Sequence, residues 1–243
     1  MTAPTEPAAR DLYDRWHSAL GPGDEAGSPW HQLVWRHLDR ERDLRVARAL
    51  EIGCGRGGFT YWLAAQSPRP TEIVAADFSP AAVELAERES SARGVVGVRW
   101  VQADIQAIPF DDSSFDTVFS FETIEHVPDP PRAVRELARV LRPGGRLFLT
   151  TPNYLGMMGL YRGYLRVRGR RFTEVGQPIN QFTTLLRTIG WVRRAGLRVA
   201  ATSASGHYLP VPGRPPIRFR WLDAPQPLTK WFGLHSCVVA AKP

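Results

Sequence analysis

Three groups of residues in this chain have types and spacings suited to chemistry. The first is a glycine-rich turn, Gly53-Cys54-Gly55-Arg56-Gly57-Gly58, which follows apolar residues that run up to Glu51. Glycine adopts backbone angles closed to other residues and lets the chain approach a ligand closely, and the amides of a following helix N-terminus then face that ligand. By itself the turn also fits an ordinary strand–turn–helix that binds nothing.

The second group is a single acid, Asp77, at the end of an apolar strand predicted over Glu72–Asp77. It follows the glycine turn by about 20 residues, the spacing at which an acidic side chain meets ribose hydroxyls in dinucleotide-type folds. The turn and the acid together favour a ligand that contains a ribose.

The third group is Glu122, Glu125 and His126, which follow a strand predicted over Phe115–Phe121. If these residues form a helical turn, their spacing places all three side chains on one side. Two carboxylates and an imidazole can hold Mg²⁺, Mn²⁺ or a similar ion, which would orient and acidify a bound hydroxyl. His126 is also a candidate general base, because its ordinary pKa is near neutrality. The alternatives are that His126 only hydrogen-bonds a loop, that Glu122 lines the ligand and that Glu125 is solvated.

A scaffold of alternating strands and helices is predicted to hold these groups. Besides the strand that ends at Glu51, strands are predicted over Glu72–Asp77, Val98–Gln102, Phe115–Phe121, Arg146–Thr150, Leu197–Ser203 and His235–Ala241. Helices are predicted over Asp11–Leu20, Trp30–Leu38, Phe59–Ala65, from Ser79-Pro80 to Gly94, from Asp129-Pro130 to Pro143-Gly144-Gly145, and over Thr183–Ala195. This alternation predicts an α/β fold, a doubly wound, Rossmann-like, mostly parallel sheet of seven strands with helices on both faces.

We expect one domain over residues 1–243. Its expected parts are a disordered start (1–9), N-terminal helices (10–44), a ligand-binding core (45–152), an insertion on the acceptor side (153–182) and the C-terminal part of the sheet (183–243). A proline-rich stretch between the last two strands is predicted to be a long loop.

Composition places the chain among ordinary proteins with a sizeable core. Hydrophobic residues make up 43% and charged residues 23%. Cys54 and Cys237 suggest no disulfide framework, and no apolar run or signal pattern indicates a membrane span or export, so we expect a cytoplasmic protein. The net charge of +7 suits nucleic acid or an anionic small substrate, but it also fits a chain that uses Arg where others use Lys, since Lys occurs only at Lys230 and Lys242.

With these motifs in view, the sequence resembles the class I S-adenosylmethionine-dependent methyltransferases, within them the type 11/12 and ubiquinone-biosynthesis O-methyltransferase group. The resemblance covers roughly residues 45 to 155 closely. It rests on Glu51–Gly57, Asp77, Gln102-Ala103-Asp104, Phe115–Val118 and Leu141–Leu147. It implies S-adenosylmethionine as the cofactor and a small-molecule acceptor. In this family the N-terminal helices cover the cofactor, although they can equally be simple packing.

The resemblance and the chemistry of the cofactor assign roles to the core residues. Amides around Gly53 and Gly55 are expected to meet the amino-acid end, with Glu51 supporting the loop, Cys54 as a small residue beside it, and Asp77 binding the ribose. We expect Phe78 to cover the adenine, and Asp104 with Ile105 to meet its amino group. Ala103 and Phe121 complete the expected cofactor site. Asp104 can alternatively be a residue that only turns its loop.

The metal prediction has a counterpart in two subgroups. The Glu122-x-x-Glu125-His126 pattern looks like that of the ubiquinone O-methyltransferases and the plant small-RNA 2′-O-methyltransferases, and Thr150–Tyr154 matches the RNA group. Resemblance implies a divalent ion that binds two vicinal oxygens. One departure is the region Gln177–Gln181, which lacks the further His of the RNA group. His207 is a substitute only if its loop folds inward.

The insertion over 153–182 is expected to build the acceptor pocket, because it leaves the fifth strand where the methyl group must emerge. Tyr154, Tyr161 and Arg162 are its candidate substrate residues, suited to an acceptor with a carboxylate, a phosphate or a planar ring. A solvated basic lid is the alternative. We therefore expect O-methylation of a small molecule in quinone-type or secondary-metabolite biosynthesis, with His126 and Glu122 as the catalytic residues. The alternatives are N- or C-methylation, an RNA methyltransferase, for which no RNA-binding module is visible, and a non-catalytic cofactor-binding partner.

Overall fold

A computed structural model describes residues 6–19, 27–45, 47–170, 181–209, 211, 217–224 and 227–243. Its main sheet has seven strands in the order β3-β2-β1-β4-β5-β9-β6. These are β1 (Arg48–Ile52), β2 (Glu72–Asp77), β3 (Val98–Gln102), β4 (Phe115–Phe121), β5 (Leu141–Pro152), β6 (Arg198–Ser205) and β9 (His235–Ala241). Strand β9 runs antiparallel to both neighbours, whereas β1 to β5 pair in parallel. The predicted doubly wound α/β fold is confirmed.

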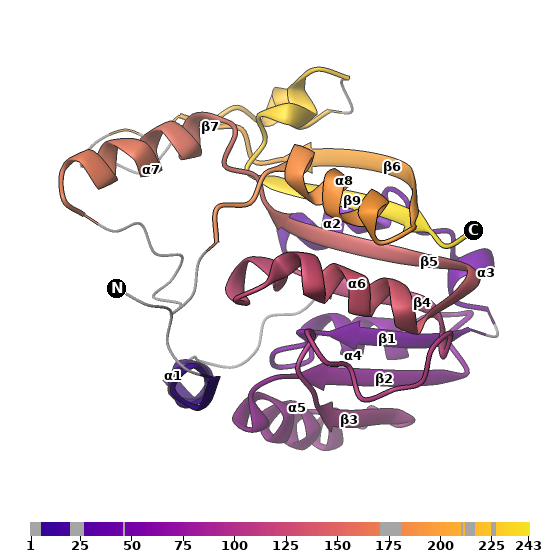
Figure 1. Cartoon of the computed structure of the whole chain (residues 1–243). Helices are drawn as coiled ribbons and strands as arrows, with labels where there is room; N and C mark the ends of the chain where they lie inside the picture. Colours follow the sequence, from indigo (N-terminus) through magenta and orange to yellow (C-terminus); the bar gives the residue numbers. More distant parts are fainter. Residues whose placement is uncertain are drawn as a thin grey trace.

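Helices cover both faces of this sheet (Figure 1). The helices are α1 (Glu6–Ala19), α2 (Pro29–Trp35), α3 (Arg40–Asp43), α4 (Gly58–Ala64), α5 (Pro80–Ala92), α6 (Pro130–Val140), α7 (Met157–Val167) and α8 (Leu185–Arg194). Helices α6 and α8 pack on one face with side chains such as Leu137 and Val192. Helices α2 and α4 pack on the other with Leu33 and Phe59. The two faces therefore enclose separate hydrophobic cores.

The strands are buried on both sides because alternate residues enter different cores. In β1, Leu50 and Ile52 belong to the core under α6 and α8, whereas Ala49 belongs to the core under α2 and α4. Continuous apolar strands of this kind are what a parallel sheet covered on both faces requires.

Helix starts follow the expected capping chemistry. The Ser79 side chain accepts a hydrogen bond of 3.1 Å from the Ala82 amide at the start of α5. Asp129 accepts one of 3.0 Å from the Arg132 amide at the start of α6. Both caps satisfy amides that the helix itself leaves without a partner, so these two predicted boundaries are confirmed.

Several boundaries differ from the predictions. Helix α1 begins at Glu6, so residues 6–9, which were predicted to be disordered, are helical, and residues 1–5 lie outside the described part. Helix α6 ends at Val140 rather than at Pro143-Gly144-Gly145, because Leu141 already pairs with Phe115 as part of β5.

The insertion and the proline-rich stretch contain elements that were not predicted. Helix α7 lies within residues 153–182, of which 171–180 are outside the described residues. The proline-rich stretch contains a small hairpin, β7 (Tyr208–Leu209) with β8 (Ile217–Arg218), and the 3₁₀ helices η2 (Arg220–Asp223) and η3 (Thr229–Trp231). Across the described ranges, none of the helices has the length and apolar character needed to cross a bilayer.

A buried ion pair joins the N-terminal segment to the sheet. The Arg146 guanidinium of β5 donates a hydrogen bond to the Asp43 carboxylate, whose side chain is 1% exposed. Asp43 also accepts from the Asp39 amide at 2.8 Å, and Thr117 of β4 donates to the Asp43 carbonyl at 2.7 Å. This cluster fixes α3 under the amino ends of β4 and β5, opposite the edge that carries the predicted site.

Replacing Arg146 by Ala should destabilise the protein by up to about 3–5 kcal/mol, because the buried Asp43 carboxylate loses its buried countercharge and keeps only the exposed Arg42 beside it. Urea unfolding followed by circular dichroism measures this change. Arg142→Ala, which removes an exposed pair with Asp116, is the matched control and should cost at most about 1 kcal/mol. Equal losses in the two variants would contradict the assignment.

Candidate active site

The glycine turn joins β1 to α4 at the carboxyl edge of the sheet. The Gly53 and Cys54 amides donate to the Ala76 carbonyl at 2.8 and 3.0 Å, which ties the turn to β2. Gly53 has φ +80°, and a Cβ atom there would lie 2.1 Å from Thr123 Oγ1. The turn therefore packs directly against the segment that follows β4, and a side chain at Gly53 would separate them.

Glu51 lies under the turn with only 3% of its surface exposed. Its carboxylate accepts a hydrogen bond from the Thr60 hydroxyl of α4. Burial raises the pKa of Glu51 to about 8, and the nearby Asp77 carboxylate adds to that rise. The hydrogen bond between Glu51 and Thr60 ties the end of β1 to α4, the two elements that the turn joins.

Asp77 joins the turn to the start of α5. Its Oδ2 accepts a hydrogen bond of 2.8 Å from the Gly55 amide, and its Oδ1 accepts one of 2.9 Å from the Ser79 amide. The Ala103 amide donates to the Asp77 carbonyl at 2.8 Å. Asp77 therefore holds three strand ends in one arrangement, and Cys54 and Ala103 are buried beside it.

Helix α1 covers this arrangement. The Arg10 guanidinium lies 5.0 Å from the centre of the Phe78 ring. Asp14 accepts a hydrogen bond from the Ser79 hydroxyl, and the His17 ring lies 3.6 Å from the position that a Gly55 Cβ would occupy. The His17 imidazole is buried, which lowers its pKa. An N-terminal cover over the predicted cofactor site is therefore observed, although its residues were not identified from the sequence.

The loop after β3 has a turn held by Asp104. The Asp104 carboxylate accepts a hydrogen bond of 2.8 Å from the Gln106 amide, the local pattern of an Asx turn. Ile105 is buried in the core. The loop-turning alternative for Asp104 is therefore observed, and its contact with an adenine amino group stays a prediction.

The end of β4 places Glu122 beside a histidine that the sequence did not indicate. Phe121 packs edge-on against Phe59 with ring centres 4.6 Å apart. Glu122 has φ +47°, an unusual conformation for a non-glycine residue that is often found at functional sites. Its Oε2 lies 3.3 Å from Nδ1 of His235, the first residue of β9, and its Oε1 is buried with no hydrogen-bond partner among the described residues.

The 3₁₀ turn η1 (Ile124–His126) contains the acid Glu125 and the candidate base His126. Glu125 is fully buried and accepts a hydrogen bond of 2.9 Å from the Thr151 hydroxyl. Its Oε1 lies 3.5 Å from Nε2 of His126. The Tyr13 ring of α1 meets the His126 ring edge-on, with ring centres 6.4 Å apart. A carboxylate and an imidazole thus lie together directly under the covering helix.

The predicted metal set does not share one helical turn. Glu122 precedes η1 in a left-handed conformation and pairs with His235, whereas Glu125 is held by Thr151. Nowhere in the described ranges do three or more His, Cys, Asp or Glu side chains form a possible metal site. His207 is no substitute, because its ring nitrogens lie 2.9 Å from Asp223 Oδ1 and 2.8 Å from the Thr229 carbonyl.

Two of the three predicted substrate residues lie together. Tyr154 is 2% exposed and stacks on Phe182 with ring centres 5.6 Å apart. The Arg162 guanidinium lies 4.7 Å from the centre of the Tyr154 ring. Tyr161 instead stacks on Tyr164. The preceding residue, Asn153, donates to two carbonyls of the segment before β9 and accepts from the Leu185 amide, so it fixes the position of Tyr154.

The sequence is similar to those of known methyltransferases. A family model described as a methyltransferase domain matches residues 50–149. The chain is 32% identical over 202 residues to a ubiquinone biosynthesis O-methyltransferase of Xanthomonas euvesicatoria, covering 79% of each protein. It is 30% identical over 213 residues to the 27-O-demethylrifamycin SV methyltransferase of Amycolatopsis mediterranei, covering 83% of this chain and 75% of that protein.

A solved structure has the same fold. It is an S-adenosylmethionine-dependent methyltransferase of Thermotoga maritima, with a TM-score of 0.63 and 20% identity over 96% of each chain. The similarity of the sequence to the Xanthomonas protein extends well beyond the core motifs, over most of both chains. The chain therefore belongs to the class I S-adenosylmethionine-dependent methyltransferases, and it is an enzyme of that family.

Proposed function

We propose that this enzyme transfers the methyl group of S-adenosylmethionine to a hydroxyl group of a small molecule of quinone-type or secondary-metabolite biosynthesis. The observation that carries the proposal is the carboxylate–imidazole contact between Glu125 and His126 at the carboxyl edge of β4. A hydroxyl acceptor must lose a proton as it is methylated, and a neutral imidazole held by a carboxylate suits that step. Two relatives named above as O-methyltransferases support it.

The proposed cofactor site is the glycine-rich turn between β1 and α4, which helix α1 covers. The amides of Gly53 and Gly55 face the amino-acid end, with Glu51 and Cys54 behind them. Asp77 binds the ribose hydroxyls with the lone pairs that its two amide contacts leave. Phe78 covers the adenine, and Asp104, Ile105 and Ala103 line its edge, with Phe121 next to the sulfonium. The burial of Glu51, Cys54 and Ala103 supports this assignment.

The cofactor, when bound, supplies an electrophilic methyl group on a sulfonium. The protein then has to align the acceptor oxygen with that methyl group and remove the hydroxyl proton. The imidazole of His126 accepts the proton, and the buried Glu125 carboxylate, which lies 3.5 Å from Nε2, stabilises the imidazolium that forms. Glu122, held by His235, lines the opposite side of this space.

Tyr154 and Arg162 are the proposed acceptor residues. Tyr154 is buried and supports the other two members of this group, Arg162 and the Phe182 ring, which is 44% exposed. Phe182 offers a planar aromatic face and Arg162 a positive charge, which suits a ring that carries a carboxylate or phosphate. Tyr161 is a weaker candidate in this arrangement, because its ring packs on Tyr164.

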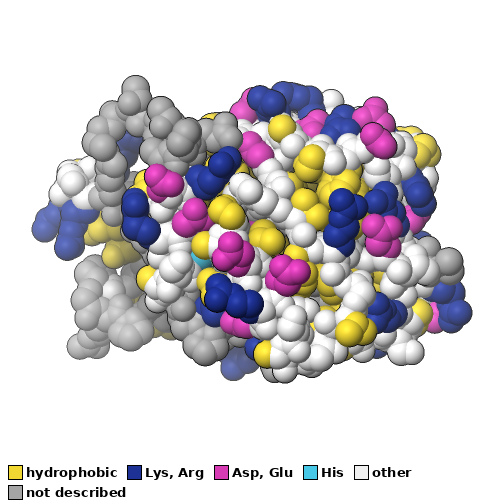
Figure 2. Space-filling view, turned by 90° about the horizontal axis from the view of Figure 1, so that it is seen from below, with side chains coloured by type: hydrophobic (Ala, Val, Ile, Leu, Met, Phe, Trp, Pro, Cys, Tyr) yellow, Lys and Arg dark blue, Asp and Glu magenta, His cyan; other side chains and the backbone are white. Residues whose placement is uncertain are grey.

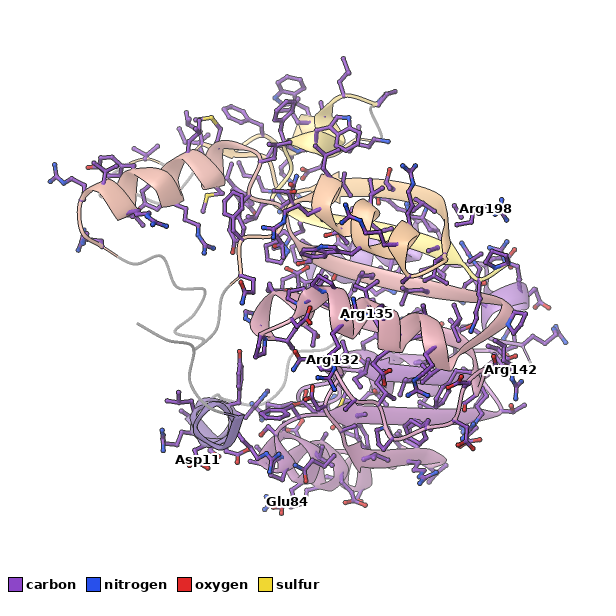
Figure 3. All side chains as sticks on the ribbon, in the orientation of Figure 1. Asp11, Glu84, Arg132, Arg135, Arg142 and Arg198 are labelled. Atoms are coloured by element: carbon purple, nitrogen blue, oxygen red, sulfur yellow. The ribbon has the colours of Figure 1, made fainter. Side chains whose placement is uncertain are left out.

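Methylation of RNA is less well supported. The exposed arginines Arg132 and Arg135 of α6, Arg142 of β5 and Arg198 of β6 lie apart rather than in one tract (Figure 3). Several arginines are also engaged, since Arg142 pairs with Asp116 and Arg132 donates to the Gln106 carbonyl. On the face seen in Figure 2, basic and acidic side chains are interspersed. N- or C-methylation of a small molecule remains the alternative that product analysis separates.

A divalent ion requires a different arrangement from the one described. Glu122 and Glu125 are held by separate partners, so the residues present do not fit a shared ion, and we derive no step through one. Turnover in excess EDTA, with and without added Mg²⁺ or Mn²⁺, tests this directly.

Asp77→Ala should weaken the binding of S-adenosylhomocysteine by on the order of 1.5–3 kcal/mol, because charge-assisted hydrogen bonds to the ribose are lost. Isothermal calorimetry measures the effect, and Asp111→Ala, which changes an exposed acid, serves as the control. Unchanged affinity in a folded Asp77→Ala protein would show that the ribose is bound elsewhere.

His126→Ala should lower kcat by about 10²–10⁴-fold and leave S-adenosylhomocysteine affinity unchanged, because only the proton acceptor is lost. The acceptor is chosen by screening phenols, catechols and hydroxylated carboxylic acids for methyl incorporation. His37→Ala is the control, since that half-buried histidine pairs with Ser203 away from the site. If both variants turn over like the unmodified enzyme, hydroxyl deprotonation by His126 is refuted.

Replacing Arg162 by Met, or Tyr154 by Leu, should raise the KM for the acceptor by roughly tenfold and leave cofactor affinity unchanged, because the first change removes the charge that meets the acceptor and the second removes the ring that holds Arg162 and Phe182 in place. Steady-state kinetics with the acceptor found in the screen checks this. Arg69→Met, a change of an exposed arginine in the loop between α4 and β2, is the control. A fall in cofactor affinity with an unaltered acceptor KM would place the pocket elsewhere.

A further inference from the structure

The end of β4 and the start of β9 carry a second carboxylate–imidazole pair. Strand β5 lies between these two strands (Figure 1), so the 3.3 Å contact between Glu122 Oε2 and His235 Nδ1 crosses β5 near its carboxyl end. Both side chains keep 15% of their surface exposed, which leaves the pair reachable for a ligand. The reaction outlined above uses Glu125 and His126 and gives His235 no contact with the acceptor.

Hydrogen-bonding capacity beside this pair is unused. Glu122 Oε1 is buried and has no partner among the described residues. Ser205 pairs with His235 across β6 and β9, and its buried hydroxyl also has no partner within the described part of the chain. Buried polar atoms are nearly always hydrogen-bonded in native proteins. Two unpaired ones beside a reachable pair therefore indicate a ligand group that bonds to them.

The backbone of Glu122 is held in the conformation that forms this pair. Its φ of +47° is strained for a non-glycine residue, and such strain persists mostly where the surrounding structure holds it at a functional site. The Glu122 amide donates to the Thr150 carbonyl of β5 at 3.1 Å, which fixes the position of the residue. The side chain thus meets β9 instead of joining the turn that contains Glu125.

Helix α2 adds aromatic rings to this region. The Trp30 ring lies beside that of His235, with ring centres 5.3 Å apart. The buried His31 ring meets Phe121 edge-on, with ring centres 5.4 Å apart. Burial lowers the pKa of His31 to about 4, so its ring is uncharged at neutral pH and brings no positive charge here. A carboxylate oxygen beside an indole ring suits a hydrogen-bond donor, either a hydroxyl or an ammonium group.

The group formed by Trp30, Glu122, Ser205 and His235, named here the β9 niche, adjoins both proposed binding regions. Thr123 follows Glu122 directly and packs against Gly53 of the glycine turn. On the other side, Pro152 pairs with His235, and the next amide of the chain, that of Asn153, donates to the Leu234 carbonyl. Tyr154 comes one residue later. The β9 niche therefore lies between the proposed cofactor turn and the proposed acceptor residues.

We propose that the β9 niche is a specificity site for the acceptor, which binds a hydroxyl or ammonium group on a part of the acceptor away from the methylated oxygen. The donor group bonds to Glu122 Oε1, while His235 holds the carboxylate through Oε2. The Trp30 ring packs against the acceptor beside that group. This inference rests on the proposed function, because it requires an acceptor bound between the glycine turn and Tyr154.

Binding to the enzyme loaded with S-adenosylhomocysteine tests the β9 niche without turnover. The probes are phenols that carry a methyl, a hydroxymethyl or an aminomethyl group, each as the 3- and the 4-isomer, and calorimetry measures their Kd. At least one hydroxymethyl or aminomethyl phenol should bind roughly tenfold more tightly than the methyl phenol of the same shape, because a hydrogen bond to a carboxylate contributes about that factor. Which of the two is preferred identifies the donor group.

Two variants test whether this preference comes from the β9 niche. Glu122→Met removes the accepting oxygens, and His235→Phe keeps a ring beside Trp30 but removes the bond that holds Glu122. Both should bring the Kd ratio close to one, with the affinity for S-adenosylhomocysteine unchanged, whereas a merely structural role would weaken all the phenols alike. His37→Phe is the matched control, since that half-buried histidine bonds to Ser203 of β6.

The proposal is overturned if no phenol binds, if the three groups bind the unmodified enzyme equally, or if the preference persists in both variants. The same loss of preference in His37→Phe would also overturn it. Methyl incorporation into the same phenols is measured separately. If the preference depends on Glu122 and His235 but no phenol is methylated, the proposed hydroxyl methylation fails and the β9 niche stands, so the two failures are distinguishable.

Discussion

The attachment of the glycine turn to β2 is the constraint on which the site depends. Two amides of the turn share the Ala76 carbonyl, and the Gly55 amide binds the Asp77 carboxylate. These bonds hold the carboxyl ends of β1 and β2 level with each other. They leave no room for a side chain between Gly53 and Thr123. Because Thr123 directly precedes η1, the position of His126 follows from the same contacts. The proposed nucleoside-binding region and the proposed reacting region are therefore built on the same edge of the sheet.

Much of the fold follows from patterns within short stretches of sequence. Strand β9 has the predicted bounds, His235–Ala241, and the starts of α5 and α6 lie where Ser79 and Asp129 cap them. Such features depend on local periodicity and local hydrogen bonds, which a sequence displays directly. Helix α7 was missed because its apolar residues contact no core, so the usual link between an apolar stripe and burial does not apply to it.

The parts of the site that were not predicted depend on long-range contacts. Glu122 and His235 are 113 residues apart, and the register between β5 and β9 brings their ends together. Glu122 has a positive φ, which separates it from the turn that contains Glu125. No local sequence signal predicts this conformation, because glycine is the usual residue at a positive φ. The resemblance led us to expect N-terminal helices over the cofactor, but no local signal shows that Tyr13 and His17 are the residues of α1 that meet the site.

Helix α1 lies over two different regions of the proposed site. Arg10 and Asp14 contact Phe78 and Ser79 on the nucleoside side, whereas Tyr13 contacts the ring of His126 on the reacting side. One rigid helix therefore closes over both regions at once. Displacing α1 would therefore remove the aromatic edge beside the His126 imidazole and uncover the glycine turn in one step, so the two regions would open together.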